Sequence, residues 1–199
     1  LEDTQAELRA SDFKQVLRED PQVQALLAGE TYLRWHSEWR FVSDDPLKKQ
    51  LAMEDRSEVM RVLLPVVRQA RRNLSILTPY FVPAASGTAE LVTAAQRGPE
   101  VKVLTNSLAA TDVAIVHGGY MRSRRPLLRG GVQLWELRPV GTDDPGYTLM
   151  GLSGASLHTK AMIVDDEQIF VGSYNLDPRS KSLNTEQGVL LTDPVMAAE

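Results

Sequence analysis

Short apolar segments alternate with helical segments through the middle of this chain, and this alternation restricts the possible folds more than any other feature. The apolar segments, typical of buried strands, are residues 74–78, 101–105 and 132–137, and the helical segments between them are residues 87–97 and 112–128. Strands that are separated by helices pair in parallel through right-handed crossovers. The pattern therefore predicts an α/β domain with a mixed, largely parallel β-sheet flanked by helices.

Further elements extend this pattern at both ends. Before it, a helix that is interrupted or restarted at Pro21, a strand and a second helix are predicted at residues 4–28, 39–42 and 55–72. After it come a Gly- and Pro-rich loop, the two strands of a hairpin and a last strand, at residues 139–154, 157–164, 168–171 and 187–191. We therefore expect a helical connector over residues 1–30 and one domain over residues 31–199.

The densest group of chemically useful side chains lies in the predicted hairpin and just after it. It has the pattern H-x-K-x4-D-x6-G-S-x-N, followed by an acid on the last strand, and comprises His158, Lys160, Asp165, Gly172, Ser173, Asn175 and Glu186. Side chains alternate between the faces of a strand, so His158 and Lys160 point the same way and can meet one phosphate. A neutral imidazole is a competent nucleophile, an ammonium offsets charge on phosphate oxygens, and Ser and Asn donate hydrogen bonds. Asp165 lies an odd number of residues from His158, so we interpret it as a residue that fixes the hairpin turn.

The pattern resembles the HKD signature of the phospholipase D superfamily. Four further segments resemble its bacterial cardiolipin synthase branch, particularly the C type: residues 77–83, 105–112, 175–180 and 184–186. The resemblance implies that residues 31–199 form a phospholipase D-like lobe whose C-terminal hairpin carries the HKD motif. Members of this branch carry two HKD motifs, and this chain is similar to the second repeat, truncated at both ends.

The resemblance also implies roles for individual residues. The catalytic residues would be His158, Lys160, Asp165 and Glu186, with Glu186 accepting the second imidazole N–H. The phosphate-binding residues would be Gly172, Ser173 and Asn175. Tyr80, Asn106 and Asp112 follow predicted strands, at the end where α/β sheets bind ligands, and are possible substrate contacts. For Asn106 and Asp112, capping of the following helix is the alternative.

One histidine cannot complete a transfer through a phosphohistidine, because a second group must protonate the leaving alkoxide. His36 and His117 lack the H-x-K context. We therefore expect the second histidine from outside this chain. It would come from a first HKD lobe of the same polypeptide or from a second copy of this chain in a homodimer.

The amino-acid composition limits which ligands and partners this chain can bind. The chain has no cysteine, and its three histidines are not grouped with acids at metal-ligand spacing, so we expect no metal and no cofactor. The net charge of −4 argues against nucleic acid as a partner, whereas phospholipid head groups suit a phosphodiester site. Arg122, Arg125 and Arg129 are at helical spacing and either face anionic lipid or form a solvated helix face.

Three functions are compatible with these features. The first is a phosphatidyltransferase that acts on phospholipids through a phosphohistidine, with this chain as one catalytic half. The second is a phosphodiesterase or nuclease that transfers to water, and the third is an inactive lobe that only folds or binds phosphate. The first implies peripheral association with the cytoplasmic side of the bacterial inner membrane, since no segment has the roughly 18 apolar residues of a membrane-spanning helix.

Overall fold

The computed structural model describes residues 19–29, 36–52, 56–138 and 156–198. The start of the first predicted helix and the predicted loop at residues 139–154 lie outside the described residues. The chain forms two compact units, residues 1–37 and residues 38–199. The first unit contains helix α3, Pro21–Leu27, which begins at the predicted restart because Asp20 Oδ1 accepts a hydrogen bond from the Val23 backbone N–H at 3.1 Å. The role of residues 1–30 as a connector stays a prediction.

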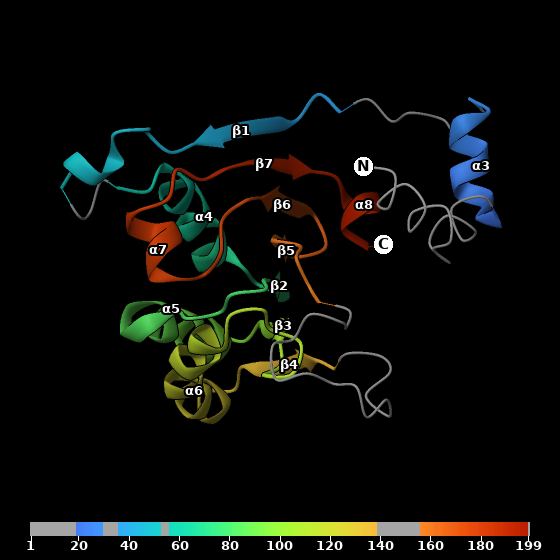
Figure 1. Ribbon diagram of the computed structural model, residues 1–199. Helices are drawn as coiled ribbons and strands as arrows, with labels where there is room; N and C mark the ends of the chain where they lie inside the picture. Colours follow the sequence, from blue (N-terminus) through green and yellow to red (C-terminus); the bar gives the residue numbers. More distant parts are fainter. Residues whose placement is uncertain (1–18, 30–35, 53–55, 139–155, 199) are drawn as a thin grey trace, which may run out of the picture. The chain divides into compact units, whose positions relative to one another are not determined.

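The second unit contains one mixed sheet, in which the described residues form seven strands in the order β1-β7-β6-β5-β2-β3-β4 (Figure 1). The strands are β1 (Trp39–Ser43), β2 (Asn73–Leu77), β3 (Glu100–Asn106), β4 (Gln133–Leu137), β5 (Ala161–Val164), β6 (Gln168–Gly172) and β7 (Gln187–Thr192). β2, β3 and β4 are parallel, and the other neighbours are antiparallel. The predicted mixed sheet flanked by helices is confirmed. Its antiparallel share is larger than predicted, because β5 enters antiparallel to β2 and the following strands alternate in direction.

Helices follow most of the strands. They are α4 (Glu58–Gln69), α5 (Ala84–Gln96), α6 (Ala114–Arg129), α7 (Pro178–Ser182) and α8 (Pro194–Ala198). α4 begins later than predicted, because Ser57 caps it by accepting a hydrogen bond from the Met60 backbone N–H at 3.2 Å. α7 was not predicted, although Asp177 before Pro178 is a helix-start signal. In the described part of the chain, no helix has the length and apolar character needed to cross a bilayer.

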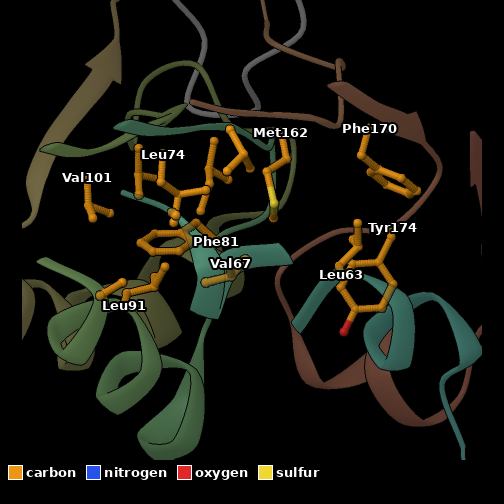
Figure 2. Packing of buried hydrophobic residues seen from close by; sticks show 14 of the residues in the cluster. Leu63, Val67, Leu74, Phe81, Leu91, Val101, Met162, Phe170 and Tyr174 are labelled. Carbon is orange, nitrogen blue, oxygen red and sulfur yellow. The ribbon is translucent and has the colours of Figure 1, made fainter. Parts of the chain in front are cut away.

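One face of the sheet packs against α4, α5 and α6 to form the hydrophobic core. Figure 2 shows the strand residues Leu74, Val101, Met162 and Phe170 in one cluster with the helix residues Leu63, Val67 and Leu91. Because side chains alternate along a strand, this buried face fixes the register of every strand. Burial of one such side chain contributes on the order of 1.5–3 kcal/mol. The core therefore determines which residues reach each edge of the sheet.

The predicted hairpin is confirmed as β5 and β6. Asp165 and Asp166 have φ values of +57° and +53°, and the Glu167 backbone N–H donates to the Val164 carbonyl at 3.1 Å. Two successive residues with positive φ match the twist of the flanking strands, and Asp tolerates this conformation better than most side chains. The turn therefore follows from local sequence.

Candidate active site

The predicted site residues gather at one edge of the sheet. In the strand ladder, Leu77 lies opposite Ala161, and Ala161 lies opposite Val171. The carboxyl ends of β2, β3 and β6 therefore meet the amino ends of β5 and β7 at this edge. The residues at or just beyond these strand ends are Tyr80, Asn106, Asp112, His158, Lys160, Ser173, Asn175 and Glu186. Segments that are far apart in the sequence thus supply one site.

His158 and Lys160 lie before β5, which corrects the predicted strand at residues 157–164. The Lys160 ammonium donates a hydrogen bond to the His158 carbonyl oxygen at 2.7 Å. Burial lowers the pKa of Lys160, while the nearby carboxylates of Glu186 and Asp112 act in the opposite direction. The His158 side chain is exposed. The pair therefore presents an accessible imidazole beside a partly desolvated ammonium.

Asn106 holds the backbone that leads into His158. Its Oδ1 accepts a hydrogen bond from the Leu157 backbone N–H at 2.9 Å, and its Nδ2 donates to the Leu157 carbonyl at 3.1 Å. Nδ2 also lies 3.2 Å from Ser156 Oγ. Since the side chain is 3% exposed and its amide is engaged in this way, the structure favours positioning of His158 over the predicted contact with substrate. The bonds also explain why this stretch does not pair as a strand.

Glu186 is 4% exposed and receives three hydrogen bonds. Ser180 Oγ and Asn184 Nδ2 donate to Oε1 at 2.7 and 3.2 Å, and Ser173 Oγ donates to Oε2. Within the ranges that the structure describes, no hydrogen bond joins Glu186 to the His158 imidazole. The predicted contact between these two residues is therefore not made here. Glu186 instead fixes the hydroxyl of Ser173 at the edge of the sheet.

A buried ion pair between Asp44 and Lys48 holds the backbone around Glu186, and the sequence did not predict it. Asp44 Oδ2 accepts hydrogen bonds from the Lys48 ammonium at 2.5 Å and from the Glu186 backbone N–H at 3.1 Å. Asp44 Oδ1 accepts from the Val59 backbone N–H at 3.2 Å. Lys48 also donates to the carbonyl of Ser180 at 2.8 Å. No local signal in the sequence distinguishes these two charged residues from surface ones.

Gly172 and Asn175 occupy close-packed positions. A Cβ on Gly172 would lie 2.3 Å from the Gln187 carbonyl oxygen, so only glycine fits. Asn175 is buried, and its backbone N–H donates to Ser180 Oγ at 3.2 Å. Thr78 Oγ1 lies 3.4 Å from Asn175 Oδ1. These contacts show how the loop after β6 is held, and phosphate binding by Gly172, Ser173 and Asn175 stays a prediction.

Tyr80 and Asp112 form a separate pair at the same edge. The Tyr80 hydroxyl lies 2.9 Å from both carboxylate oxygens of Asp112, which accept its hydrogen bond. Burial and the Asp112 carboxylate raise the pKa of Tyr80 to about 12. The Tyr80 hydroxyl therefore stays protonated at neutral pH and fixes Asp112 near Lys160. Contact of either residue with substrate stays a prediction.

Asp165 lies at the opposite end of β5 from Lys160. Its carboxylate accepts hydrogen bonds from the backbone N–H groups of Arg71, Arg72 and Asn73 at 2.7–3.1 Å. Desolvation raises the pKa of Asp165, but these hydrogen bonds together outweigh it and hold the pKa below its usual value. The geometry favours a role in joining the hairpin turn to β2 over the predicted catalytic role.

An apolar cleft of about 350 Å³ lies between α4, α5 and α7. Its lining includes Leu63, Val67, Leu91, Tyr174 and Leu176. Tyr174 is the residue between Ser173 and Asn175, so the cleft adjoins the site segment. Among the described residues, no cluster of three or more His, Cys, Asp or Glu side chains is arranged to hold a metal ion. The described part of the site thus contains an exposed imidazole, an ammonium, two carboxylates and several hydroxyl and amide groups, and the segment after β6 that belongs to it also lines an apolar cleft.

Comparison with known proteins shows which family this chain belongs to. The family model described as "Cardiolipin synthase, PLD-like domain" matches residues 63–199. The chain belongs to this family. Asp44 and Lys48 precede the residues that the family model matches, although they support the PLD-like site.

Relatives of this PLD-like domain are longer proteins. The chain is 39% identical over 186 residues to cardiolipin synthase C of Escherichia coli strain K12, a match that covers 91% of this chain and 39% of that protein. It is 31% identical over 159 residues to an uncharacterized protein of Helicobacter pylori, which covers 79% of this chain and 31% of that protein. The chain thus spans well under half the length of these two relatives.

Solved structures confirm the fold of the PLD-like domain. Nuc, a phospholipase D family member from Salmonella typhimurium, matches with a TM-score of 0.54 and 22% identity over 81% of this chain and 88% of that chain. Phosphatidylserine synthase of Haemophilus influenzae matches with a TM-score of 0.58 and 20% identity over 80% of this chain and 36% of that chain. The predicted phospholipase D-like α/β lobe is therefore confirmed.

Proposed function

We propose that this PLD-like domain is one catalytic half of a cardiolipin synthase-like phosphatidyltransferase. The observation that carries the proposal is the convergence of His158, Lys160, Ser173 and Glu186 at one sheet edge. The family match and the 39% identity to a cardiolipin synthase support it. The second HKD histidine comes from a first lobe or from a second copy of the chain, because His117 is buried beside Tyr120.

In the first step of the proposed reaction, the imidazole of the other half attacks the phosphorus of the donor lipid. A P–N bond forms, the P–O bond to the leaving alcohol breaks, and protonated His158 gives its proton to the leaving alkoxide. Lys160 stabilises the charge that develops on the phosphate oxygens. The product is a phosphatidyl-histidine and a free alcohol.

In the second step, neutral His158 takes the proton from the hydroxyl of the acceptor alcohol. The acceptor oxygen forms a P–O bond while the P–N bond breaks, so the nucleophilic imidazole is regenerated and His158 ends protonated, as it began. Glu186 acts in both steps by holding Ser173 and the start of β7. No nucleotide or metal takes part in these steps.

A lipid substrate suits the surroundings of the site. The cleft beside Tyr174 is lined mainly by apolar side chains, whereas a nucleic acid substrate needs a basic groove along its backbone. The proposal places the protein at the surface of the bacterial inner membrane, where its substrate lies.

The test is lipid turnover by the protein in the longest form that its gene encodes. Vesicles of phosphatidylglycerol are incubated with wild type, with His158→Ala and with the control His36→Ala, and the products are measured by mass spectrometry. We expect diphosphatidylglycerol from wild type and control, and a loss of at least about 1,000-fold for His158→Ala.

The products decide between the functions. Phosphatidic acid in place of diphosphatidylglycerol would show transfer to water, and cleavage of nucleic acid without action on lipid would show a nuclease. Unchanged lipid transfer by His158→Ala would contradict the assigned site. A monomeric protein without any turnover would indicate an inactive lobe.

A further inference from the structure

Helix α6 has a charge distribution that the proposed reaction does not explain. It contains Arg122, Arg124, Arg125 and Arg129 and no acidic residue, in a chain whose net charge is −4. A local excess of positive charge on an acidic protein attracts a negatively charged partner to that place. The side chains of α6 show which face such a partner would meet.

The inward face of α6 belongs to the core. His117, Tyr120, Ser123 and Leu127 are buried on this face. Arg124 is tied to it, because its guanidinium pairs with Glu136 at 3.1 Å and lies over the ring of Tyr120 at 5.8 Å. Arg124 therefore has a structural explanation.

The outward face carries the other three arginines. Arg122, Arg125 and Arg129 are exposed, and spacings of three and four residues place them on the same side of the helix. In the described part of the chain, no ion pair joins any of them to an acid. Three unpaired guanidinium groups on one face can each bind a phosphate.

Large apolar side chains accompany these arginines. Ile115, in the first turn of α6, is 84% exposed, and Leu108, in the loop before it, is 59% exposed. Met121 and Leu128 are more than half exposed on the flank of the arginine row. A solvated helix face does not require these side chains, whereas a face that enters a membrane interface combines apolar and basic groups.

The position of α6 connects this face to the site. α6 begins two residues after Asp112, which accepts the hydrogen bond of Tyr80 at the site edge. Leu108 and Ile115 therefore lie at the same edge of the sheet as His158. Figure 1 shows α6 beside β4, the last strand of the sheet, and α6 contacts β4 and α5.

We propose that the outward face of α6 docks the protein on an anionic phospholipid bilayer. Arg122, Arg125 and Arg129 bind the phosphates of the head groups, and the apolar residues at the start of the helix enter the interface. Docking in this way brings the site edge to the lipid surface. The inference rests on the proposed function for its purpose, but binding to lipid can be measured without any turnover.

The experiment is co-sedimentation of the whole chain with vesicles of phosphatidylglycerol and phosphatidylcholine, and with vesicles of phosphatidylcholine alone. Wild type is compared with the triple variant Arg122→Gln, Arg125→Gln, Arg129→Gln. We expect the variant to bind the anionic vesicles on the order of 10- to 100-fold more weakly, because each basic residue near an anionic surface strengthens binding several-fold. Wild-type binding should also weaken as salt is added, and that of the variant should change less.

A matched control removes the same charge elsewhere. The variant Arg40→Gln, Lys49→Gln, Arg61→Gln changes three exposed residues outside α6, and we expect it to bind the anionic vesicles like wild type. Thermal unfolding of both triple variants shows that each one is folded. Equal losses of vesicle binding in the two triple variants would contradict the proposal, since binding would then depend on the net charge of the protein alone.

The contribution of the exposed apolar side chains to vesicle binding is tested with the variant Ile115→Ser. We expect weaker binding to anionic vesicles with an unchanged salt dependence. Wild-type binding to phosphatidylcholine vesicles as strong as to anionic ones would overturn the proposal. So would tighter binding to duplex DNA than to anionic vesicles, with no effect of Ile115→Ser.

A second measurement separates this inference from the proposed function. Lipid transfer in mixed detergent micelles should be similar for wild type and the α6 triple variant, while transfer on vesicles should fall in the variant. Vesicle binding that depends on the arginines, without any lipid transfer, would contradict the proposed function and still support the docking face. Wild-type rates of lipid transfer on vesicles by the α6 triple variant would contradict the docking face and still support the proposed function.

Discussion

The Lys48 ammonium lies 2.5 Å from the Asp44 carboxylate, and both side chains are fully buried. The pair joins three segments of the chain. The Asp44 carboxylate also accepts hydrogen bonds from the backbone N–H groups of Glu186 and Val59. The Lys48 ammonium also donates a hydrogen bond to the Ser180 carbonyl. Charged groups without solvent are tolerated only when their hydrogen bonds are complete. The pair therefore fixes the loops beneath the active site.

Lys48→Met should lower the free energy of unfolding by about 3–5 kcal/mol, because it leaves the Asp44 carboxylate buried without its partner. Chemical denaturation measures this change. Lys49→Met is the matched control, since Lys49 is exposed, and should change stability by less than about 0.5 kcal/mol. Equal stabilities of the two variants would show that the pair does not support the fold.

Asn106→Ala should slow lipid transfer, because it releases the Leu157 backbone that positions His158. A displacement of a catalytic group by about 1 Å costs up to about 100-fold in rate. We expect kcat to fall by about 10- to 100-fold while KM changes little. Asn106→Asp keeps the acceptor for the Leu157 N–H and should give an intermediate kcat. A wild-type kcat for Asn106→Ala would exclude the positioning role.

Asp165→Asn should affect stability and its pH dependence, and should leave transfer by the folded protein unchanged. The pKa of Asp165 is lower in the folded protein than in the unfolded chain, so its stabilisation is complete above the unfolded pKa of about 3.9. It is lost as the pH falls through the folded value. We expect the melting temperature of the variant to be lower by about 2–4 °C at pH 7.

The difference between wild type and Asp165→Asn should disappear in acid, once the pH has fallen below the lowered pKa of Asp165 in the folded protein. Asn tolerates the positive φ of this turn position, so the comparison isolates the charge. Asp166→Asn, in which only the single bond from Asn73 Nδ2 is affected, serves as the control with a smaller effect. A large loss of kcat in folded Asp165→Asn would favour the catalytic role.

Gly188→Ala should destabilise the protein because the new methyl group would lie 2.3 Å from the ring of Phe170. Overpacking of this kind costs about 1–3 kcal/mol. Gly118→Ala is the control, because nothing lies within 4 Å of a Cβ there and alanine favours the helix. Adding Phe170→Leu should recover part of the loss in Gly188→Ala. A double-mutant cycle without such coupling would contradict this explanation.

Local patterns predicted the elements whose causes are local. The turn at Asp165 and Asp166 and the restart of a helix at Pro21 were found because short-range backbone preferences determine them. The strand predicted across His158 and Lys160 begins only at Ala161, because Asn106, from a distant strand, binds the backbone of Leu157. Periodicity cannot reveal a contact of this range.

The sequence predicted which residues gather at the sheet edge better than it predicted the contacts that these residues make. The HKD-like pattern identified His158, Lys160, Ser173 and Glu186, and the sheet brings them to one edge. The burial of Asp44 and Lys48 was not predicted, because a charged pair in a turn looks the same in sequence whether exposed or buried. The hydrogen bonds that Glu186 accepts from the hydroxyl groups of Ser173 and Ser180 were not predicted, and its bond to the His158 imidazole stays a prediction.

The pairing of β1 with β7 has a consequence for the order of folding. These two strands come from opposite ends of the domain sequence, with Trp39 opposite Leu191 and Ser43 opposite Gln187. Contacts between such distant segments are slow to form, because a long loop must close first. A ribosome-bound chain therefore holds β1 without its partner until β7 has been synthesised. The edge that carries Glu186 therefore cannot take its final form before β7 has been synthesised.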